Sequence, residues 1–159
     1  MMTSKSHPGD PESPPSGSAS DDRSLLVRLA AAVATQAHAQ QHRRDGVTPY
    51  ITHPEAVALR VRREPAEVIA AAWLHDVLED TQETPASLRA AGLPEIVVAA
   101  VVVLTKSGDG CEEYLARVRA NPIARKVKVA DMLHNLSDEP TQRQILKYTR
   151  GLLALLENP

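Results

Sequence analysis

The feature that most constrains this fold is an apolar stretch that ends in a group of charged residues. Pro65 suits the first position of a helix, and residues 66–74 are almost wholly apolar, which predicts a helix through the middle of the fold. Directly after it come one imidazole and three carboxylates: His75, Asp76, Glu79 and Asp80. Because side chains three and four positions apart share one face of a helix, these four can converge on one small volume.

Such a concentration of acids is costly inside a protein. A carboxylate taken out of water destabilises the fold unless it is paired or bound to a metal, and neighbouring carboxylates repel one another. A divalent cation bound by these side chains would offset the charge of the three carboxylates beside the histidine. The alternative is a solvated helix end with ordinary surface acids, and residues elsewhere in the chain decide between the two.

Three other segments carry residues of the same kind. They are the arginine pair 43–44, residues 50–54 (YITHP) and residues 128–135 (KVADMLHN). Together with the pair at 75–76 they supply a histidine, a His-Asp pair and an aspartate in that order. This order favours the metal-binding interpretation.

The segments resemble those of the HD superfamily of phosphohydrolases. More narrowly, residues 24–156 resemble the hydrolase domain of RelA/SpoT-type enzymes, and the chain is similar to a stand-alone small alarmone hydrolase. The most specific segment is 74–81 (LHDVLEDT), because its Glu-Asp-Thr end is not part of the generic His-Asp signature. The resemblance implies an HD-type helical domain with a phosphohydrolase site at these segments.

The resemblance also implies a metal centre with one ion. Its ligands would be His53, His75, Asp76 and Asp131. In the alarmone hydrolases the metal is manganese; two imidazoles and two carboxylates with open positions would also suit Fe²⁺ or Zn²⁺, whereas the lack of thiolates argues against a closed structural zinc. Glu79 and Asp80 would be the catalytic residues that orient and deprotonate a metal-bound water. As alternatives, His53 could be a helix cap, and Asp131 could simply hold Lys128 in a salt bridge.

The reaction implied is hydrolysis of the 3′-pyrophosphate of ppGpp or pppGpp to GDP or GTP and pyrophosphate. The residues expected to bind this small guanosine nucleotide are Arg43, Arg44, Lys128, Asn135 and Tyr148. In the family the first arginine packs against guanine and the next basic residue faces phosphate. The loop here is one residue longer, so the two roles stay open. Asn135 would contact the ribose and 3′-phosphate, Tyr148 the nucleoside, and Lys106 or Lys128 would add positive charge.

Two departures from the family bear on the substrate. The connection between Lys106 and Lys128 is shorter than usual, and Met132 stands where the family usually has arginine. Either change could reshape the substrate site and leave the metal site intact. One alternative is therefore an HD nucleotidase or pyrophosphohydrolase that acts on other nucleotides. A second is a non-catalytic nucleotide-binding module, against which the pair Glu79 and Asp80 argues.

The composition of the chain limits the classes of partner and the compartment that we expect. A formal charge of −2 and an aromatic content of 3% disfavour a nucleic-acid polymer. The single cysteine, Cys111, excludes an internal disulfide and fits a reducing compartment. The longest apolar run, residues 96–104, is too short to span a bilayer, and no signal peptide opens the chain. We therefore expect a soluble cytoplasmic protein with no membrane contact and, since no synthetase domain follows Pro159, no regulation by an attached domain.

The pattern along the chain predicts one all-α domain. Residues 1–22 are rich in Ser, Pro, Gly and Asp and are expected to be a disordered tail, with the HD-type domain over 23–159. Apolar spacing and capping residues predict helices over 24–41, from 53 onward, and over 65–80, 84–92, 94–104, 111–121, 123–136 and 140–157. The pair His38 and His42 is expected to have structural or ligand-supporting roles. The inner side of the last helix is predicted to carry Ile145, Tyr148, Leu152 and Leu156.

Overall fold

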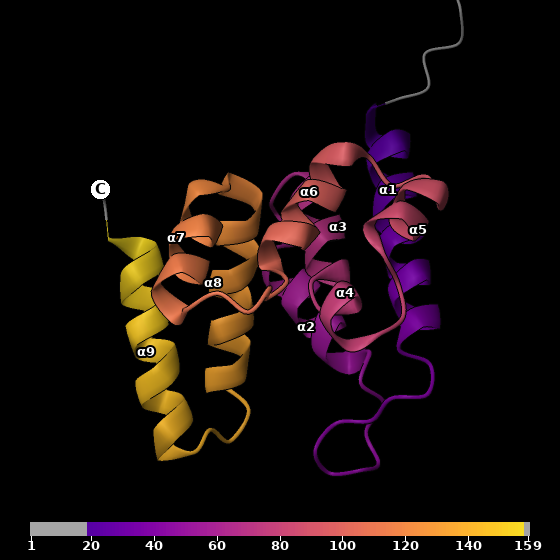
Figure 1. Ribbon diagram of the computed structural model, residues 1–159. Coiled ribbons are helices and arrows are strands. Elements are labelled where there is room, and N and C mark those ends of the chain that lie inside the picture. The colour runs from indigo at the N-terminus through magenta and orange to yellow at the C-terminus, as the bar shows by residue number, and fades with distance from the viewer. Residues whose placement is uncertain (1–18, 158–159) are drawn as a thin grey trace, which may run out of the picture.

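The computed structural model describes residues 19–157, and all its regular elements there are helices. Their bounds are α1 Ala19–Ala37, α2 Thr52–Arg60, α3 Ala66–Leu74, α4 Val77–Asp80, α5 Pro85–Ala90, α6 Glu95–Leu104, α7 Cys111–Ala120, α8 Pro122–Leu136 and α9 Gln142–Leu156 (Figure 1). Within the described residues, β-type pairing is confined to an isolated bridge between His42 and Pro49. The predicted all-α fold is confirmed.

The N-terminal boundary differs from the expected one. Helix α1 begins at Ala19, so residues 19–22 belong to the helix and not to a tail. Asp21 and Asp22 favour this start, because acids in a first turn interact with the positive end of the helix dipole. The rest of the predicted tail, residues 1–18, lies outside the described residues.

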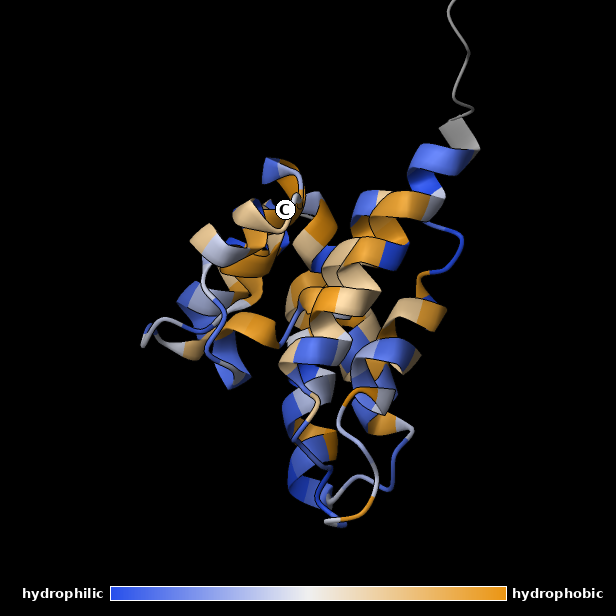
Figure 2. Ribbon diagram, turned by 90° about the vertical axis from the view of Figure 1, so that its right-hand side faces the viewer, coloured by the Kyte–Doolittle hydropathy of each residue, from blue (hydrophilic) through white to orange (hydrophobic). Residues whose placement is uncertain are grey.

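Helix α3 lies at the centre of the bundle. It packs against α1, α2, α6 and α8, and Ala70, Ala71, Ala72 and Leu74 have no exposed surface. A helix that is apolar on every side is stable when neighbours cover it all round, and alanine side chains let those neighbours approach closely. Figure 2 shows apolar residues along the central helices and hydrophilic ones in the loops at the lower end. The end of α3, where the His-Asp pair follows, is thus held in place by several helices.

Helix α6 confirms the helical prediction for a valine-rich segment. Val97, Val98, Ala100, Val101 and Leu104 are all buried. Their spacing places them on one face, and burial of that face outweighs the preference of valine for strands. Among the described helices, none is both long and apolar enough to cross a membrane.

The prediction for the inner side of α9 is wrong in part. Ile145 and Leu156 are 45% and 62% exposed, whereas Gly151 and Leu155 are the buried residues of this helix. The cause is a close approach between α9 and α8: a Cβ atom added at Gly151 would lie 2.6 Å from Cε of Met132. The helix therefore turns its glycine side toward α8 and not the side that carries Ile145 and Leu156.

The predicted helix over 65–80 is interrupted where the charged residues begin. Helix α3 ends at Leu74, and α4 begins at Val77. Between them, Asp76 has φ −102° and ψ −5°, away from regular helical values. Glu79 and Asp80 therefore lie on a separate helix of four residues, α4.

Candidate metal centre

Three helices bring buried ligand atoms to one point. His53 lies in the first turn of α2, His75 follows the end of α3, and Asp131 lies on α8; their ligand atoms are all within 4.8 Å of one another. The two Nε2 atoms are 3.2 Å apart, and Oδ1 of Asp131 is 3.2 Å from Nε2 of His53. Neighbouring ligands of an ion bound at about 2.1 Å are separated by about 3 Å, so this spacing suits a metal.

Asp76 completes the group. Its Oδ2 lies 3.0 Å from Nε2 of His75 and 3.5 Å from Nε2 of His53. The structure thus brings together all four residues that the sequence predicts as ligands, from segments far apart in the chain. The burial of His53 at the start of a helix distinguishes it from an exposed cap.

The donor chemistry also fits a divalent cation. Nδ1 of His75 lies 2.8 Å from the backbone oxygen of Ala72, which can only accept, so Nδ1 carries the proton. In the neutral ring, Nε2 then directs a lone pair toward His53 and Asp76, as a metal ligand does. Lone pairs and carboxylates that face one another in a buried space repel unless a cation lies between them.

Protons compensate the charge of the cluster when no cation does. Burial lowers the pKa of His75, but Asp76 and Asp131 outweigh burial and raise this pKa to about 9. Burial raises the pKa of Asp131, but Lys128 and the two histidines outweigh it and hold this pKa well below its ordinary value. A bound metal would replace these protons, so metal affinity should fall as the pH falls.

Asp131 is oriented by its own helix. Its Oδ2 accepts from Nζ of Lys128 at 2.8 Å, and its Oδ1 accepts from Nδ2 of Asn135 at 2.7 Å. The salt bridge considered as an alternative therefore exists, but it uses the oxygen that does not face His53. The two interpretations of Asp131 are compatible, and Asn135 supports the carboxylate in addition to any contact with substrate.

Tyr50 is a candidate site residue that the sequence did not predict. Its hydroxyl donates to Oδ2 of Asp76 at 2.6 Å and lies 3.2 Å from Oδ2 of Asp80. Burial and the two carboxylates raise the pKa of Tyr50, so the phenol stays protonated and can donate. Its place three residues before His53 in the YITHP segment was a signal, but it did not show which group the hydroxyl contacts.

His38 and Gln41 support this arrangement from the segment that follows α1. The ring of His38 is buried 4.8 Å from the ring of Tyr50, and its Nδ1 lies 2.7 Å from Oε1 of Gln41. Nε2 of Gln41 donates to the backbone oxygen of Asp80 at 2.6 Å. His42, by contrast, is exposed.

Replacing Tyr50 by phenylalanine tests this bridge. The change removes the hydrogen bond to Asp76 and keeps the ring, so metal affinity should fall by about 10- to 100-fold, as expected when a partner of a metal ligand is lost. Metal titration followed by calorimetry measures the effect. Tyr148→Phe removes a tyrosine hydroxyl elsewhere and serves as the control. Equal affinity in wild type and Tyr50→Phe would show that the bridge does not orient Asp76.

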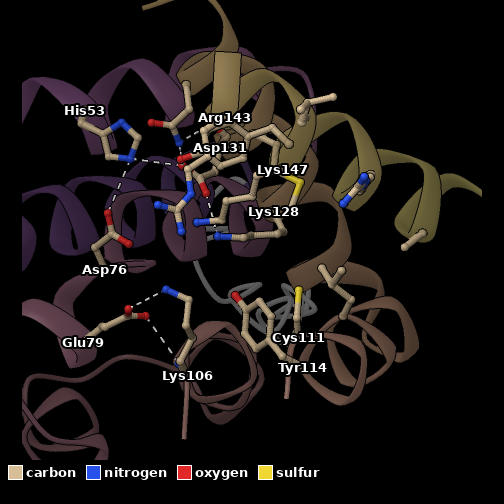
Figure 3. Close-up of a pocket in the computed structure, with 18 of the residues that line it drawn as sticks. His53, Asp76, Glu79, Lys106, Cys111, Tyr114, Lys128, Asp131, Arg143 and Lys147 are labelled. Atoms are coloured by element: carbon tan, nitrogen blue, oxygen red, sulfur yellow. Dashed lines mark hydrogen bonds and ion pairs between the residues drawn. The ribbon is translucent and has the colours of Figure 1, made fainter. Parts of the chain in front are cut away.

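The two predicted catalytic acids diverge, so the expectation that all four charged side chains converge is wrong in part. Glu79 turns to α6 and its loop, where its Oε1 accepts from Nζ of Lys106 at 2.8 Å (Figure 3). Asp80 stays beside Tyr50, and burial together with Asp76 raises its pKa. The physical reason is that Glu79 and Asp80 are adjacent on α4, so their side chains leave the helix about 100° apart.

Two cavities meet at the cluster. The α9 cavity, of about 830 Å³, lies between the cluster, α7 and α9, and its lining includes Lys106, Lys128, Asp131, Tyr114 and Tyr148 (Figure 3). The loop cavity, of about 770 Å³, lies between the loop after α1 and the turn before α9, and its lining includes Arg43, Arg44, His134 and Asp138. Tyr50, His53 and Asn135 line both. Both volumes are in the range of small-molecule sites.

The predicted substrate residues are thus divided between the cavities. Arg43 and Arg44 line the loop cavity, whereas Lys128 and Tyr148 line the α9 cavity. Arg43 also forms an ion pair with Asp138, which joins the loop after α1 to the turn before α9. A ligand that contacts both groups must extend across the metal cluster.

An all-helical fold with a histidine, a His-Asp pair and an aspartate from separate helices defines a class of metal-binding domains. The sequence model of the HD domain matches residues 30–156, and the chain belongs to this family.

Its relatives are consistent with a metal-dependent hydrolase. The chain is 36% identical over 152 residues to a probable guanosine-3′,5′-bis(diphosphate) 3′-pyrophosphohydrolase of Synechocystis, covering 84% of this chain and 20% of that protein. It is 34% identical over 129 residues to the Xenopus tropicalis guanosine-3′,5′-bis(diphosphate) 3′-pyrophosphohydrolase MESH1, covering 75% and 72%. A solved structure described as a metazoan ortholog of SpoT that hydrolyzes ppGpp is similar at a TM-score of 0.67 and 26% identity, covering 82% and 83%. The chain spans a fifth of the Synechocystis protein.

Proposed function

We propose that this protein hydrolyses the 3′-pyrophosphate of ppGpp or pppGpp and releases GDP or GTP and pyrophosphate. The observation that carries the proposal is the buried group of His53, His75 and Asp131 with the partly buried Asp76 beside it, open to two cavities that contain arginines and lysines. The names of the relatives support the substrate. Manganese is the proposed metal, and Fe²⁺ or Zn²⁺ would suit the same donors.

In this mechanism His53, His75, Asp76 and Asp131 would hold the metal. When bound, the ion would supply a water of lowered pKa and neutralise charge on the phosphoryl group. Asp80 is suited to accept the proton of the water, because burial and the charge of Asp76 raise the pKa of its carboxyl group. Tyr50 holds this carboxylate beside the cluster.

Glu79 has a different starting position. Its carboxylate is engaged by Lys106, so it must leave this ion pair before it can take part in proton transfer. A phosphate of the substrate can compete with Glu79 for Lys106, because the phosphate and the carboxylate are both anions and would lie in the same cavity as the lysine. We propose that substrate binding releases Glu79 toward the reaction.

A nucleotidase or pyrophosphohydrolase acting on other nucleotides is the second candidate. It is favoured by Met132, which is buried against α9 where the family usually has arginine, so the α9 cavity lacks one cation expected there. A panel of nucleotides separates the two. Pure protein with Mn²⁺ should convert ppGpp to GDP and pyrophosphate faster than it cleaves GTP or ATP. Metal-loaded protein that ignores ppGpp and cleaves a plain nucleotide would support the second candidate, and loaded protein that cleaves none would support a binding module.

The arginines of the loop cavity provide a second test. Removing a guanidinium from a contact with phosphate or purine leaves charge unpaired, so Arg43→Ala or Arg44→Ala should raise KM for ppGpp by about ten- to a hundredfold. Hydrolysis of p-nitrophenyl phosphate, where present, should hardly change. Asp138→Asn removes the ion pair and leaves Arg43 with its positive charge. It therefore separates the effect of the ion pair from the effect of the guanidinium group. Unaltered KM in both arginine variants would remove these residues from the substrate site.

A further inference from the structure

One face of α9 carries cations that the metal centre does not use. Arg143, Lys147 and Arg150 are spaced by four and three positions, so they lie on the same side of the helix, and all three line the α9 cavity. Figure 3 shows Arg143 and Lys147 in the cavity that also contains Asp131 and Lys128.

These cations differ from the other basic residues of the cavity in having no anionic partner. Lys106 is paired with Glu79, and Lys128 is paired with Asp131. Within residues 19–157, no acid forms an ion pair with Arg143, Lys147 or Arg150; the ammonium group of Lys147 instead lies 5.3 Å from the centre of the Tyr148 ring. Among the residues that the structure describes, Lys106 and Lys128 thus have an anionic partner and the three α9 cations have none.

The charged residues of the cavity are unevenly distributed. Asp76 and Asp131 belong to the cluster, Glu79 and Asp80 lie on α4 and Glu112 lies on α7, whereas Arg143, Lys147 and Arg150 all lie on α9. Three like charges on one helix face repel one another, and a bound anion would relieve this repulsion. From position 143 to position 150 the helix rises about 10 Å, which is long enough to contact both phosphates of a diphosphate.

We propose that Arg143, Lys147 and Arg150 form a second anion-binding subsite, which holds the 5′-phosphates of a nucleotide whose 3′-pyrophosphate lies at the metal centre. This subsite rests on the proposed function and specifies its substrate class as nucleotides phosphorylated at both ends. A nucleotide with one phosphorylated end would leave either the metal centre or the α9 cations without an anion.

The test uses three guanosine 3′-pyrophosphates that carry two, one or no phosphate at the 5′ position. In the wild type, kcat/KM should fall by about tenfold or more across this series, mainly through KM, because each charge-assisted contact contributes to binding. The triple variant Arg143→Gln, Lys147→Gln and Arg150→Gln should process all three substrates with the same kcat/KM. Its value should match that of the wild type on the substrate without 5′-phosphate.

The matched control is the triple variant Arg62→Gln, Arg63→Gln and Arg125→Gln. These three arginines are exposed and line neither cavity. Their replacement removes three positive charges, as the α9 variant does. The control should keep the wild-type dependence on 5′-phosphates. All six side chains are exposed, so both variants should keep the wild-type helical content by circular dichroism.

Two results would overturn the subsite. One is an α9 variant that still distinguishes the three substrates as the wild type does. The other is an equal loss on all three, which would place the α9 cations at the attacked pyrophosphate. Failure of the proposed function gives a separate result: metal-loaded wild type would hydrolyse none of the three substrates.

Discussion

Replacing His75 and Asp76 together by alanine is expected to abolish metal binding and, with it, hydrolysis. The change removes two of the four side chains in the cluster, and of the remaining two, Asp131 is already engaged by Lys128. Two donors cannot fix the coordination of a divalent ion, and without the ion no water of lowered pKa is available. Metal content, measured by elemental analysis, should fall from about one ion per chain to near zero.

The control for this experiment is His42→Ala with Glu55→Ala. It removes the same kinds of group from exposed positions outside the cluster and should retain the metal. Circular dichroism establishes that the variants are folded, and Asp76→Asn alone provides a milder change at the cluster. Full metal occupancy after loss of both His75 and Asp76 would show that the ion is held elsewhere.

The second large effect is expected at the acids of α4. Asp80→Asn and Glu79→Gln should each slow turnover by about 10²–10⁴-fold, the range expected of a general base, while metal content stays near the wild-type value. Single-turnover rates and metal analysis on the same samples measure both quantities. Loss of metal in place of rate would make the changed residue a ligand.

The two acids differ in their contacts before substrate binds. Glu79 is bound to Lys106 before substrate arrives, whereas Asp80 is already beside the cluster. Lys106→Ala therefore should reduce substrate affinity and leave the Asp80 side chain in place. If Lys106→Ala and Glu79→Gln have the same effect on kcat and KM, the two residues act only as a pair. Glu112→Gln, at an exposed position of the same cavity, is the control for general changes in charge.

The sequence predicted most helices because apolar spacing is a short-range pattern, which defines α3 and α6. The four clustered residues were predicted through the resemblance of their segments to those of the HD superfamily, which supplies the order His53, the 75–76 pair and Asp131 before any distance is known. The role of these residues as ligands stays a prediction until metal is measured.

The contacts that the sequence did not show all depend on long-range geometry. Glu79 and Lys106 are 27 positions apart, and their pairing depends on how α4 lies relative to the loop after α6. Tyr50 contacts Asp76 across 26 positions. Residue type and local spacing carry no information about such approaches, so neither pairing could be deduced from the pattern.

The close approach of α8 and α9 links the evolution of two positions. The methyl end of Met132 occupies the space that a side chain at position 151 would need, since a Cβ atom there would lie 2.6 Å from it. A side chain at position 151 can enter if the flexible end of Met132 turns away, if the residue at 132 becomes smaller or if α9 moves outward. Positions 132 and 151 should therefore covary among close relatives, and a lineage that acquired a long residue at 132 would also have shifted α9 and, with it, the width of the cavity.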